Sequence, residues 1–508
     1  MLRFDFLSIK TIFRYLLIVT VTLLGGIFLK EGIALLFVGL IVYYCITRNL
    51  YRAVETFFIW FFLSNFFIGQ GYLTNEFIIK YIAKPHFLLF VIFLFFLNKI
   101  PKKILQARYI YMWFFFLLLT LLSSVTQGQS PFVIITISGF FIMYLLMQAK
   151  GITHRQNQNI LNLFVAVAIS QTIVSILQVT ELIPASSKVE GGEVIIMGLD
   201  DVASGTFGAA SSHLTSWYAA LISLFLLLMW LITKNNSYLL FIVISFLQFA
   251  TVDSKTIMGV TILMLGFTIL YVFKGKKMFR ISIGKYVLII FIFAVGIFGF
   301  YAAWDSYYQY FGNKTGGTRT SINEVYKSEV VESTSLILTN IADWGKIRGY
   351  QYVVEDYIMN NPVQLIWGYG IQGYEMNGKG GYILEKDTPL MKLNNLTNNR
   401  SGLIRQFAVS GFLGFILFFY ALGIWYAFNR RKILNNYDLL KDSLLKIFLV
   451  FTIVAAFLYS IEISSIPVMT FSAIVSIYMK TSTDSSNKVR FLKDSRPMRN
   501  QRNLQNLT

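Results

Sequence analysis

Cysteine, histidine and charge are scarce in this chain, and each scarcity excludes a class of protein. Cys45 is the only cysteine among 508 residues, so neither an intrachain disulfide nor a cysteine metal cluster can form. The histidines, His86, His154 and His213, lie far apart and lack metal-ligand spacing. Charged residues make up only 14% of the chain, too few to cover a soluble domain of this size. GxGxxG and P-loop motifs are also missing, so we expect no metal, no cofactor and no nucleotide site.

Long apolar runs take the place of charge. The chain is 56% hydrophobic and contains 48 Phe and 29 Tyr. The runs have the length, roughly 17–25 residues, at which a helix crosses a bilayer. We therefore predict an all-α, polytopic transmembrane helical bundle with about fourteen spans. The predicted spans are 12–29, 32–47, 56–72, 85–98, 109–125, 131–147, 160–183, 213–233, 237–253, 256–273, 286–304, 403–428, 446–461 and 463–479.

Basic residues are unevenly distributed along this pattern. The net charge of +19 resides mainly in alternate loops and in the last segment of the chain. Such a bias is typical of cytoplasmic loops and predicts that both termini are cytoplasmic, so it signals topology and not nucleic-acid binding. The short outer loops carry only four lysines: Lys30, Lys80, Lys84 and Lys188. The predicted basic cytoplasmic tail, 480–508, is expected to be disordered and to lie near anionic membrane lipid.

Two predicted outer segments are longer than the others. Residues 184–212, within the membrane domain 1–305, are rich in Gly and Ser and indicate a loop with one short strand or re-entrant piece. Residues 306–402 are too long for a bare connection and predict a large extracytoplasmic loop with short helices, before the C-terminal spans in 403–479. Within that loop, apolar residues follow Arg348 at helical spacing until Asn361-Pro362 stops the helix.

Arg348 and the turn after this helix form one candidate site. A guanidinium in the first turn of a helix, beside outward-pointing N–H groups, suits a phosphate, although a solvated surface arginine is the simpler alternative. Trp367-Gly368-Tyr369-Gly370 follows as a predicted tight turn at the membrane surface. The order of arginine, helix, Asn-Pro and the turn from Gly368 to Tyr374 resembles a segment of the bacterial O-antigen polymerase and ligase superfamily (Wzy-type).

Three further segments carry the same resemblance. Gly411-Phe412-Leu413-Gly414 is similar to the family's glycine pair, after Asn399-Arg400-Ser401, where Arg400 stands in the place of the ligase-type histidine. Upstream, 204–208 (SGTFG) resembles the family's Gly-Thr-Phe segment, and Asp253-Ser254-Lys255 resembles its Ser-Arg pair with lysine for arginine. Together the motifs cover about residues 200–425 of the chain.

The resemblance implies a GT-C-like, metal-independent glycosyltransferase in the bacterial cytoplasmic membrane. Its substrates would be glycans on polyprenyl diphosphate, and a flippase and a chain-length regulator would be its protein partners. Cations are needed where negative charge develops on a leaving phosphate, and arginine supplies them without a metal. The candidate catalytic residues are Arg348, Arg400 and His213. The candidate substrate-binding residues are Arg405, Lys255, Tyr369, Tyr374, Gly368 and Gly370.

Several alternatives remain at the level of sequence. Arg405 and the tyrosines also suit interfacial anchoring, Lys255 can pair with Asp253, and the general base can be His213 or one of the carboxylates Asp200, Asp201, Glu355 and Asp356. The principal hypothesis is that the protein is a polymerase of lipid-linked repeat units for capsule, exopolysaccharide or O-antigen. A lipid-linked oligosaccharide flippase, an O-antigen-type glycan ligase and a membrane-embedded sensor or scaffold are the alternatives.

Overall fold

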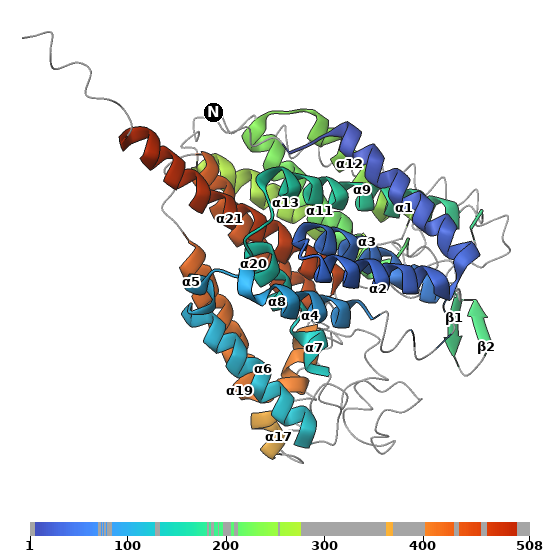
Figure 1. Cartoon of the computed structure of the whole chain (residues 1–508), viewed down its shortest axis with the longest axis horizontal. Helices are drawn as coiled ribbons and strands as arrows, with labels where there is room; N and C mark the ends of the chain where they lie inside the picture. Colours follow the sequence, from blue (N-terminus) through green and yellow to red (C-terminus); the bar gives the residue numbers. More distant parts are fainter. Residues whose placement is uncertain are drawn as a thin grey trace, which may run out of the picture.

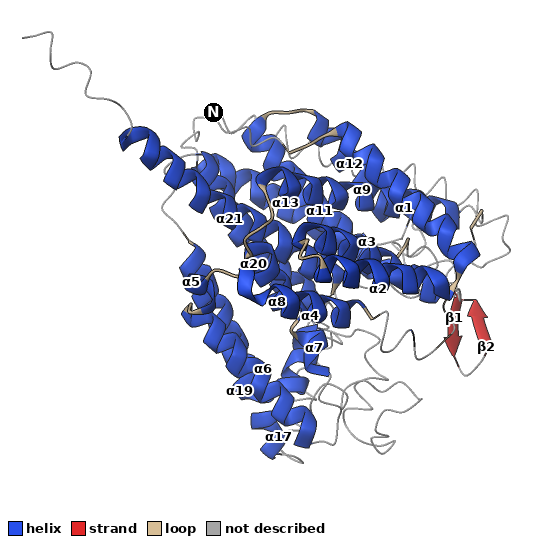
Figure 2. Ribbon diagram, viewed as in Figure 1, coloured by secondary structure: helices blue, strands red, loops and turns tan. Residues whose placement is uncertain are grey.

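A computed structural model shows a bundle of helices with one small β-hairpin (Figures 1 and 2). It describes residues 6–69, 84–126, 133–179, 182–183, 187–190, 193–196, 205–207, 212–251, 255–275, 362–368, 402–430, 436–458 and 465–494, together with Leu73, Asn75 and Ile78. Near several of the gaps only the backbone is described. The predicted span 286–304 lies outside the described residues, as does most of the loop 306–402.

Helices occupy the predicted spans that the structure describes. The N-terminal helices are α1 (Ile9–Leu29), α2 (Glu31–Ile46), α3 (Leu50–Gly69), α4 (Pro85–Phe96) with the 3-10 turn η2 (Leu97–Lys99), α5 (Lys102–Leu105), α6 (Arg108–Thr126), α7 (Val133–Ile137) and α8 (Gly139–Gln148). The later helices are α9 (His154–Val179), α11 (Ser212–Thr233), α12 (Ser237–Thr251), α13 (Lys255–Gly275), α17 (Pro362–Trp367), α19 (Gly402–Asn429), α20 (Asn436–Leu458) and α21 (Ile466–Asp494).

Among the described residues, five helices are long and apolar enough to cross a membrane. They lie in α1, α6, α9, α11 and α19, and shorter apolar helices accompany them. The chain is therefore a helical membrane protein, as the composition predicts. In α11, 94% of the apolar window is buried, against 28% in α1, so α11 is a central helix and α1 a peripheral one. The exposed apolar side chains of α1, α6 and α19 suit contact with lipid.

Aromatic rings fill much of the space between the helices. Trp60, Trp113, Trp217 and Trp425 are fully buried, although tryptophan often lies at membrane interfaces. Trp113 of α6 lies edge-on to Phe418 of α19, and these two helices run side by side away from the centre of the bundle (Figure 1). Close packing of large rings gives these interfaces apolar area and preferred geometry.

Basic loops meet at one end of the bundle, called here the basic end. Arg48 Nη1 donates a hydrogen bond to the Phe95 carbonyl at 2.6 Å, and Lys99 Nζ donates to the Arg48 carbonyl at 2.9 Å. The Lys150 amide donates to the Lys99 carbonyl at 2.8 Å, and Lys480 Nζ reaches carbonyls of the α8–α9 loop. Loops predicted to share one side of the membrane therefore share one end of the structure.

The opposite end is called here the α17 end. Because α6 and α9 start at the basic end, their last turns mark the α17 end, where α17 lies (Figure 1). Asn429, the last residue of α19, accepts a hydrogen bond from Tyr144 of α8 near the basic end. Tyr271, near the end of α13, contacts Asp442 and Lys446 near the start of α20, which follows α19 after a short link. It follows that α13 and α19 both start at the α17 end. The helix α11 starts there as well, because Gly205 lies beside Thr215 and is bound by Gln178 near the end of α9.

Some local predictions differ from the structure. The segment 184–212 contains two strands, β1 (Ser187–Glu190) and β2 (Glu193–Ile196), which pair antiparallel, in place of one short strand. Pro362 does more than close the preceding segment, because it is the first residue of α17, a position that suits its fixed φ and its missing N–H. The helix α21 continues to Asp494, so the first part of the predicted tail 480–508 is helical and not disordered.

Three helices start six or more residues earlier than predicted. The helix α3 begins at Leu50 instead of 56, α9 begins at His154 instead of 160, and α20 begins at Asn436 instead of 446. The added turns of α3 and α20 contain Glu55 and Asp442, which are buried and paired with basic residues. In the sequence, a charged residue near the end of an apolar run predicts a loop. In the structure, a partner of opposite charge lowers the free-energy cost of burying that residue in a helix.

Candidate functional site

The structure describes the predicted site residues to different extents. Gly368 is fully described and buried. His213, Lys255 and Arg405 lie in the first turns of α11, α13 and α19, with only their backbone described, and all three turns are at the α17 end. The remaining predicted site residues lie outside the described residues: Arg348, Arg400, Tyr369, Tyr374 and Gly370. The alternative bases Asp200, Asp201, Glu355 and Asp356 lie outside them as well.

Two of the glycine motifs come together in space. Gly411 interrupts the helical backbone of α19 with φ 63° and ψ −172°. A Cβ placed on Gly411 would lie 2.5 Å from the Ile366 carbonyl oxygen and 2.6 Å from the Gly368 nitrogen. The backbone of α17 and of the turn after it therefore lies directly against the break in α19. Only glycine leaves room for this approach and also adopts the positive φ freely.

The chain leading to Gly368 explains this docking. Pro362 starts α17 and the helix ends at Trp367, after which Gly368 turns the chain with φ 82°. The Gly368 carbonyl accepts a hydrogen bond from the Ser123 hydroxyl of α6 at 3.1 Å. The turn is thus attached to α6 by a hydrogen bond and to α19 by close backbone packing.

Gly414 brings α19 close to α6. A Cβ on Gly414 would meet the side chain of Ser410 and would lie 3.2 Å from Leu119 Cδ2 of α6. Small residues at helix interfaces allow the backbones of membrane helices to approach. Gly411 and Gly414 therefore have separate structural roles, the first in receiving α17 and the second in packing α19 on α6.

The Gly-Thr-Phe segment is inserted among α3, α9 and α11. The Thr206 amide donates to Gln171 Oε1 at 2.6 Å, Gln171 Nε2 also contacts the Thr206 hydroxyl, and that hydroxyl donates to the Phe62 carbonyl at 3.0 Å. The Gly205 amide donates to Gln178 Oε1 at 2.9 Å. Phe207 is fully buried against aromatic rings, including Phe62. This short loop is therefore held through its backbone by side-chain amides.

The residues that hold this loop were not predicted. Gln171, Ser175 and Gln178 lie on one face of α9 at spacings of four and three, and all three are buried. Ser175 accepts a hydrogen bond from Gln248 of α12 at 2.8 Å, so the same face joins a loop and a second helix. The sequence did contain a sign of this role, namely three uncharged polar residues on one face of an otherwise apolar span. Such side chains in membrane helices often form hydrogen bonds with neighbouring helices.

The Gly-Thr-Phe segment also lies next to the start of α11. A Cβ on Gly205 would lie 3.3 Å from Thr215 Cγ2, so the loop packs beside the first turn of α11, two residues after His213. Lys255 is the first residue of α13, and α13 packs on α11. Helix N-termini present N–H groups and a partial positive charge, which favour anions. The α17 end thus combines the starts of α11, α13 and α19 with the docked glycine turn.

Among the described residues, no group of three His, Cys, Asp or Glu side chains could hold a metal ion. Comparison of the chain with models of protein families, with curated proteins and with solved structures finds no match. Within the described part of the chain, the sequence motifs come together at the α17 end.

Proposed function

We propose that the protein is a polysaccharide polymerase that joins oligosaccharide repeat units carried on polyprenyl diphosphate. The observation that most directly supports this function is the contact between Gly368 and Gly411. These glycines belong to two motifs that are far apart in the chain, and both motifs resemble those of the O-antigen polymerase and ligase superfamily. Their contact gives the motifs a shared position at the α17 end.

Candidate substrate-binding residues follow the docked turn in the sequence. Tyr369 and Gly370 directly follow Gly368, and Tyr374 lies four residues further along the chain. Arg405 lies six residues before Gly411 in α19, or about 9 Å along the helix axis. A tyrosine ring offers an apolar face to a sugar, and a guanidinium offers paired N–H donors to a phosphate.

The proposed reaction needs cations and a base. A hydroxyl of the acceptor glycan attacks the anomeric carbon of the donor, the bond from that carbon to the diphosphate oxygen breaks, and the base takes the hydroxyl proton. Arg348, Arg400 and Arg405, with Lys255, would stabilise the charge on the leaving diphosphate. His213 is the candidate base. The reaction consumes no nucleotide and needs no metal, because the arginines neutralise the leaving group.

The proposal also assigns sides to the two ends. The basic end would face the cytoplasm and the α17 end the exterior, in a bacterial cytoplasmic membrane. Because Cys45 is buried and is the only cysteine, Ser328→Cys would give one labelling site in the loop 306–402. In intact cells, an impermeant maleimide should label this variant. Labelling only after lysis would contradict the proposed sidedness and the site with it.

Activity is tested on purified protein in detergent, where no membrane separates two compartments. Lipid-linked repeat units should be converted to a ladder of longer glycans without an energy source. Arg348→Ala should abolish the ladder, whereas Arg108→Ala, a change at an exposed arginine of the basic end, should leave it intact. Wild-type ladders from Arg348→Ala would remove Arg348 from the site. Absence of ladders from wild-type protein with several repeat-unit structures would favour the flippase, and transfer of one finished glycan to an acceptor would favour the ligase.

A further inference from the structure

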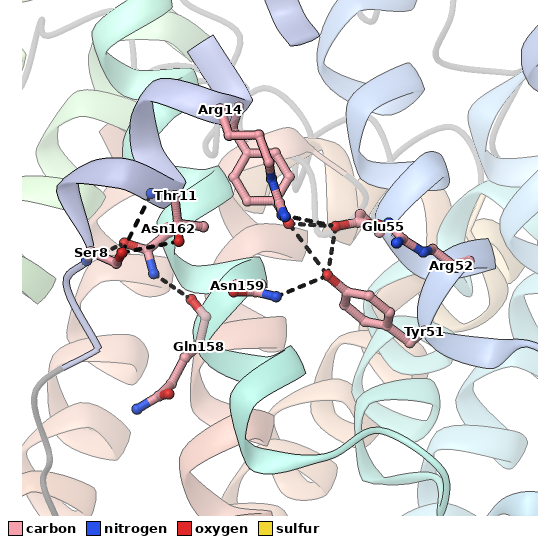
Figure 3. Close-up of polar contacts among 10 residues, drawn as sticks. Ser8, Thr11, Arg14, Tyr51, Arg52, Glu55, Gln158, Asn159 and Asn162 are labelled. Atoms are coloured by element: carbon pink, nitrogen blue, oxygen red, sulfur yellow. Dashed lines mark hydrogen bonds and ion pairs between the residues drawn. The ribbon is translucent and has the colours of Figure 1, made fainter. Parts of the chain in front are cut away.

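A buried carboxylate lies at the basic end, away from the residues assigned to glycan transfer. The Glu55 side chain in α3 is 6% exposed and accepts hydrogen bonds from the Tyr15 hydroxyl and, at 2.6 Å, from the Tyr51 hydroxyl. Its Oε2 pairs with Arg52 Nη1 at 2.6 Å, and Arg14 Nη2 of α1 lies 3.8 Å from its Oε1 (Figure 3). Glu55 therefore connects α3 to α1 through Oε1, and it holds Arg52 of its own helix through Oε2.

The two arginines are only partly neutralised. One carboxylate faces two guanidinium groups, and the side chains of Arg14 and Arg52 are each 50% exposed. At 3.8 Å, the separation of Arg14 from Glu55 is too long for a hydrogen bond, so Glu55 leaves the N–H donors of Arg14 unused. Each guanidinium also lies over a tyrosine ring, Arg14 at 4.7 Å from the Tyr15 centroid and Arg52 at 5.5 Å from the Tyr51 centroid. The cluster thus presents a fixed, positively charged surface.

Asn159 and Asn162 of α9 support this arrangement. Asn159 Nδ2 donates to the Tyr51 hydroxyl at 3.3 Å. Asn162 Oδ1 accepts from the Ser8 amide at 2.9 Å (Figure 3). The Asn162 Nδ2 donates to the Phe6 carbonyl at 2.7 Å, so Asn162 fixes the chain just before α1. The asparagines of α9 thus hold Tyr51, which contacts Glu55, and the segment that leads into α1. A preformed site binds its ligand with little ordering cost.

One exposed face of α1 continues from these charges into apolar residues. The face is formed, at alternating spacings of four and three, by Lys10, Arg14, Leu17, Val21, Leu24 and Phe28. Lys10 and Arg14 occupy the first turns, next to the basic end. The apolar members follow towards the other end, with Leu17 64% and Phe28 82% exposed. A phospholipid has the same order of chemistry, an anionic headgroup followed by acyl chains.

We propose that this face of α1, together with Arg52 of α3, binds one anionic phospholipid. The lipid phosphate lies at Lys10, Arg14 and Arg52, and an acyl chain lies along Leu17, Val21, Leu24 and Phe28. Basic surfaces between helices at the cytoplasmic side of a membrane bind anionic headgroups. The apolar continuation selects a lipid over a free phosphate. This site uses none of the residues assigned to glycan transfer, so it stands independently of the proposed function.

Native mass spectrometry of the full chain in detergent tests this site. Titration with phosphatidylglycerol and with phosphatidylcholine of the same acyl chains gives a Kd for each lipid. Phosphatidylglycerol should bind more tightly, and Arg14→Gln should weaken its binding about tenfold, the loss expected for one hydrogen bond to a charged group. Arg108→Gln removes another exposed arginine at the basic end and should leave the Kd unchanged. Equal weakening by both variants would show diffuse attraction and overturn the proposal.

Two further measurements cover other outcomes. Lys10→Gln changes an exposed residue of the first turn and should weaken phosphatidylglycerol about fivefold even if Arg14→Gln fails to fold. No change in Kd for Lys10→Gln would count against the site. Inorganic phosphate at millimolar concentration should not displace the lipid. Displacement by phosphate alone would show a free-phosphate site and overturn the assignment to a lipid.

Discussion

At the α17 end the described polar contacts that hold the motifs are neutral, whereas at the basic end the main cluster joins charged groups. Gln171, Gln178 and Ser123 hold the backbone of Gly205, Thr206 and Gly368. At the basic end, Glu55 holds arginines. Among the described contacts, the loop and the turn at the α17 end are therefore held without an arginine or a lysine. The basic end uses part of its charge to hold its own helices together.

The largest effect should come from closing the space at the break in α19. Gly411→Ala places a methyl group 2.5 Å from the Ile366 carbonyl oxygen in a backbone conformation that disfavours alanine, and should destabilise the protein by about 3 kcal/mol. Thermal unfolding in detergent measures this change. Gly423→Ala is the matched control in the same helix, since its Cβ meets nothing within 4 Å, and should be neutral or slightly stabilising. Equal stability of the two variants would contradict the docking of α17.

A smaller effect should follow from removing an amide anchor. Gln171→Leu leaves the Thr206 amide without its acceptor in a buried site, which should cost about 2 kcal/mol. Because the lost contact is neutral, the cost should be the same at low and at high salt. Ile173→Leu changes an exposed residue of the same helix and should have almost no effect. A strong dependence of the Gln171→Leu cost on salt would remove the contrast between the two ends.

The smallest effect should come from the charged cluster. Glu55→Gln keeps the shape of the side chain but leaves two half-exposed arginines without their carboxylate, and should cost about 1 kcal/mol at low salt. Salt screens the repulsion between the arginines, so the cost should fall towards high salt. Unfolding curves at several salt concentrations measure this trend. A cost that does not change with salt would show that Glu55 acts only through its neutral hydrogen bonds.

Much of the helical framework could be predicted from apolar runs alone. The starts of α3 and α20 could not, because Glu55 and Asp442 suggest a loop until their partners on other helices, Tyr15 of α1 and Tyr271 of α13, are known. The start of α17 at Pro362 was missed for another reason, because proline after asparagine was interpreted only as the end of a helix and not also as the first residue of the next one. Local sequence reports the cost of burying a charge but not the contact that offsets it.

The candidate site also contains residues that the sequence predicted and residues that it did not. The glycine motifs were found from their composition and order, and Gly368 and Gly411 are placed in contact by the structure. Nothing in the spacing of these motifs predicted that the turn after α17 would pack against the break in α19. Gln171 and Gln178 were missed because an amide in an apolar helix does not reveal which loop it binds. Ser123 was missed because its partner is a main-chain carbonyl.

The non-helical backbone at Gly411 divides α19 into two helical segments. The outer segment, 402–410, carries Arg405, and the inner segment continues to Asn429 within the bundle. A shift of residues 402–410 would be felt first by α17, because the backbone of Ile366 and Gly368 lies directly against Gly411. The packing of Gly414 on Leu119 of α6 lies beyond the break, so the longer part of α19 can keep its contact with α6 when the first part shifts.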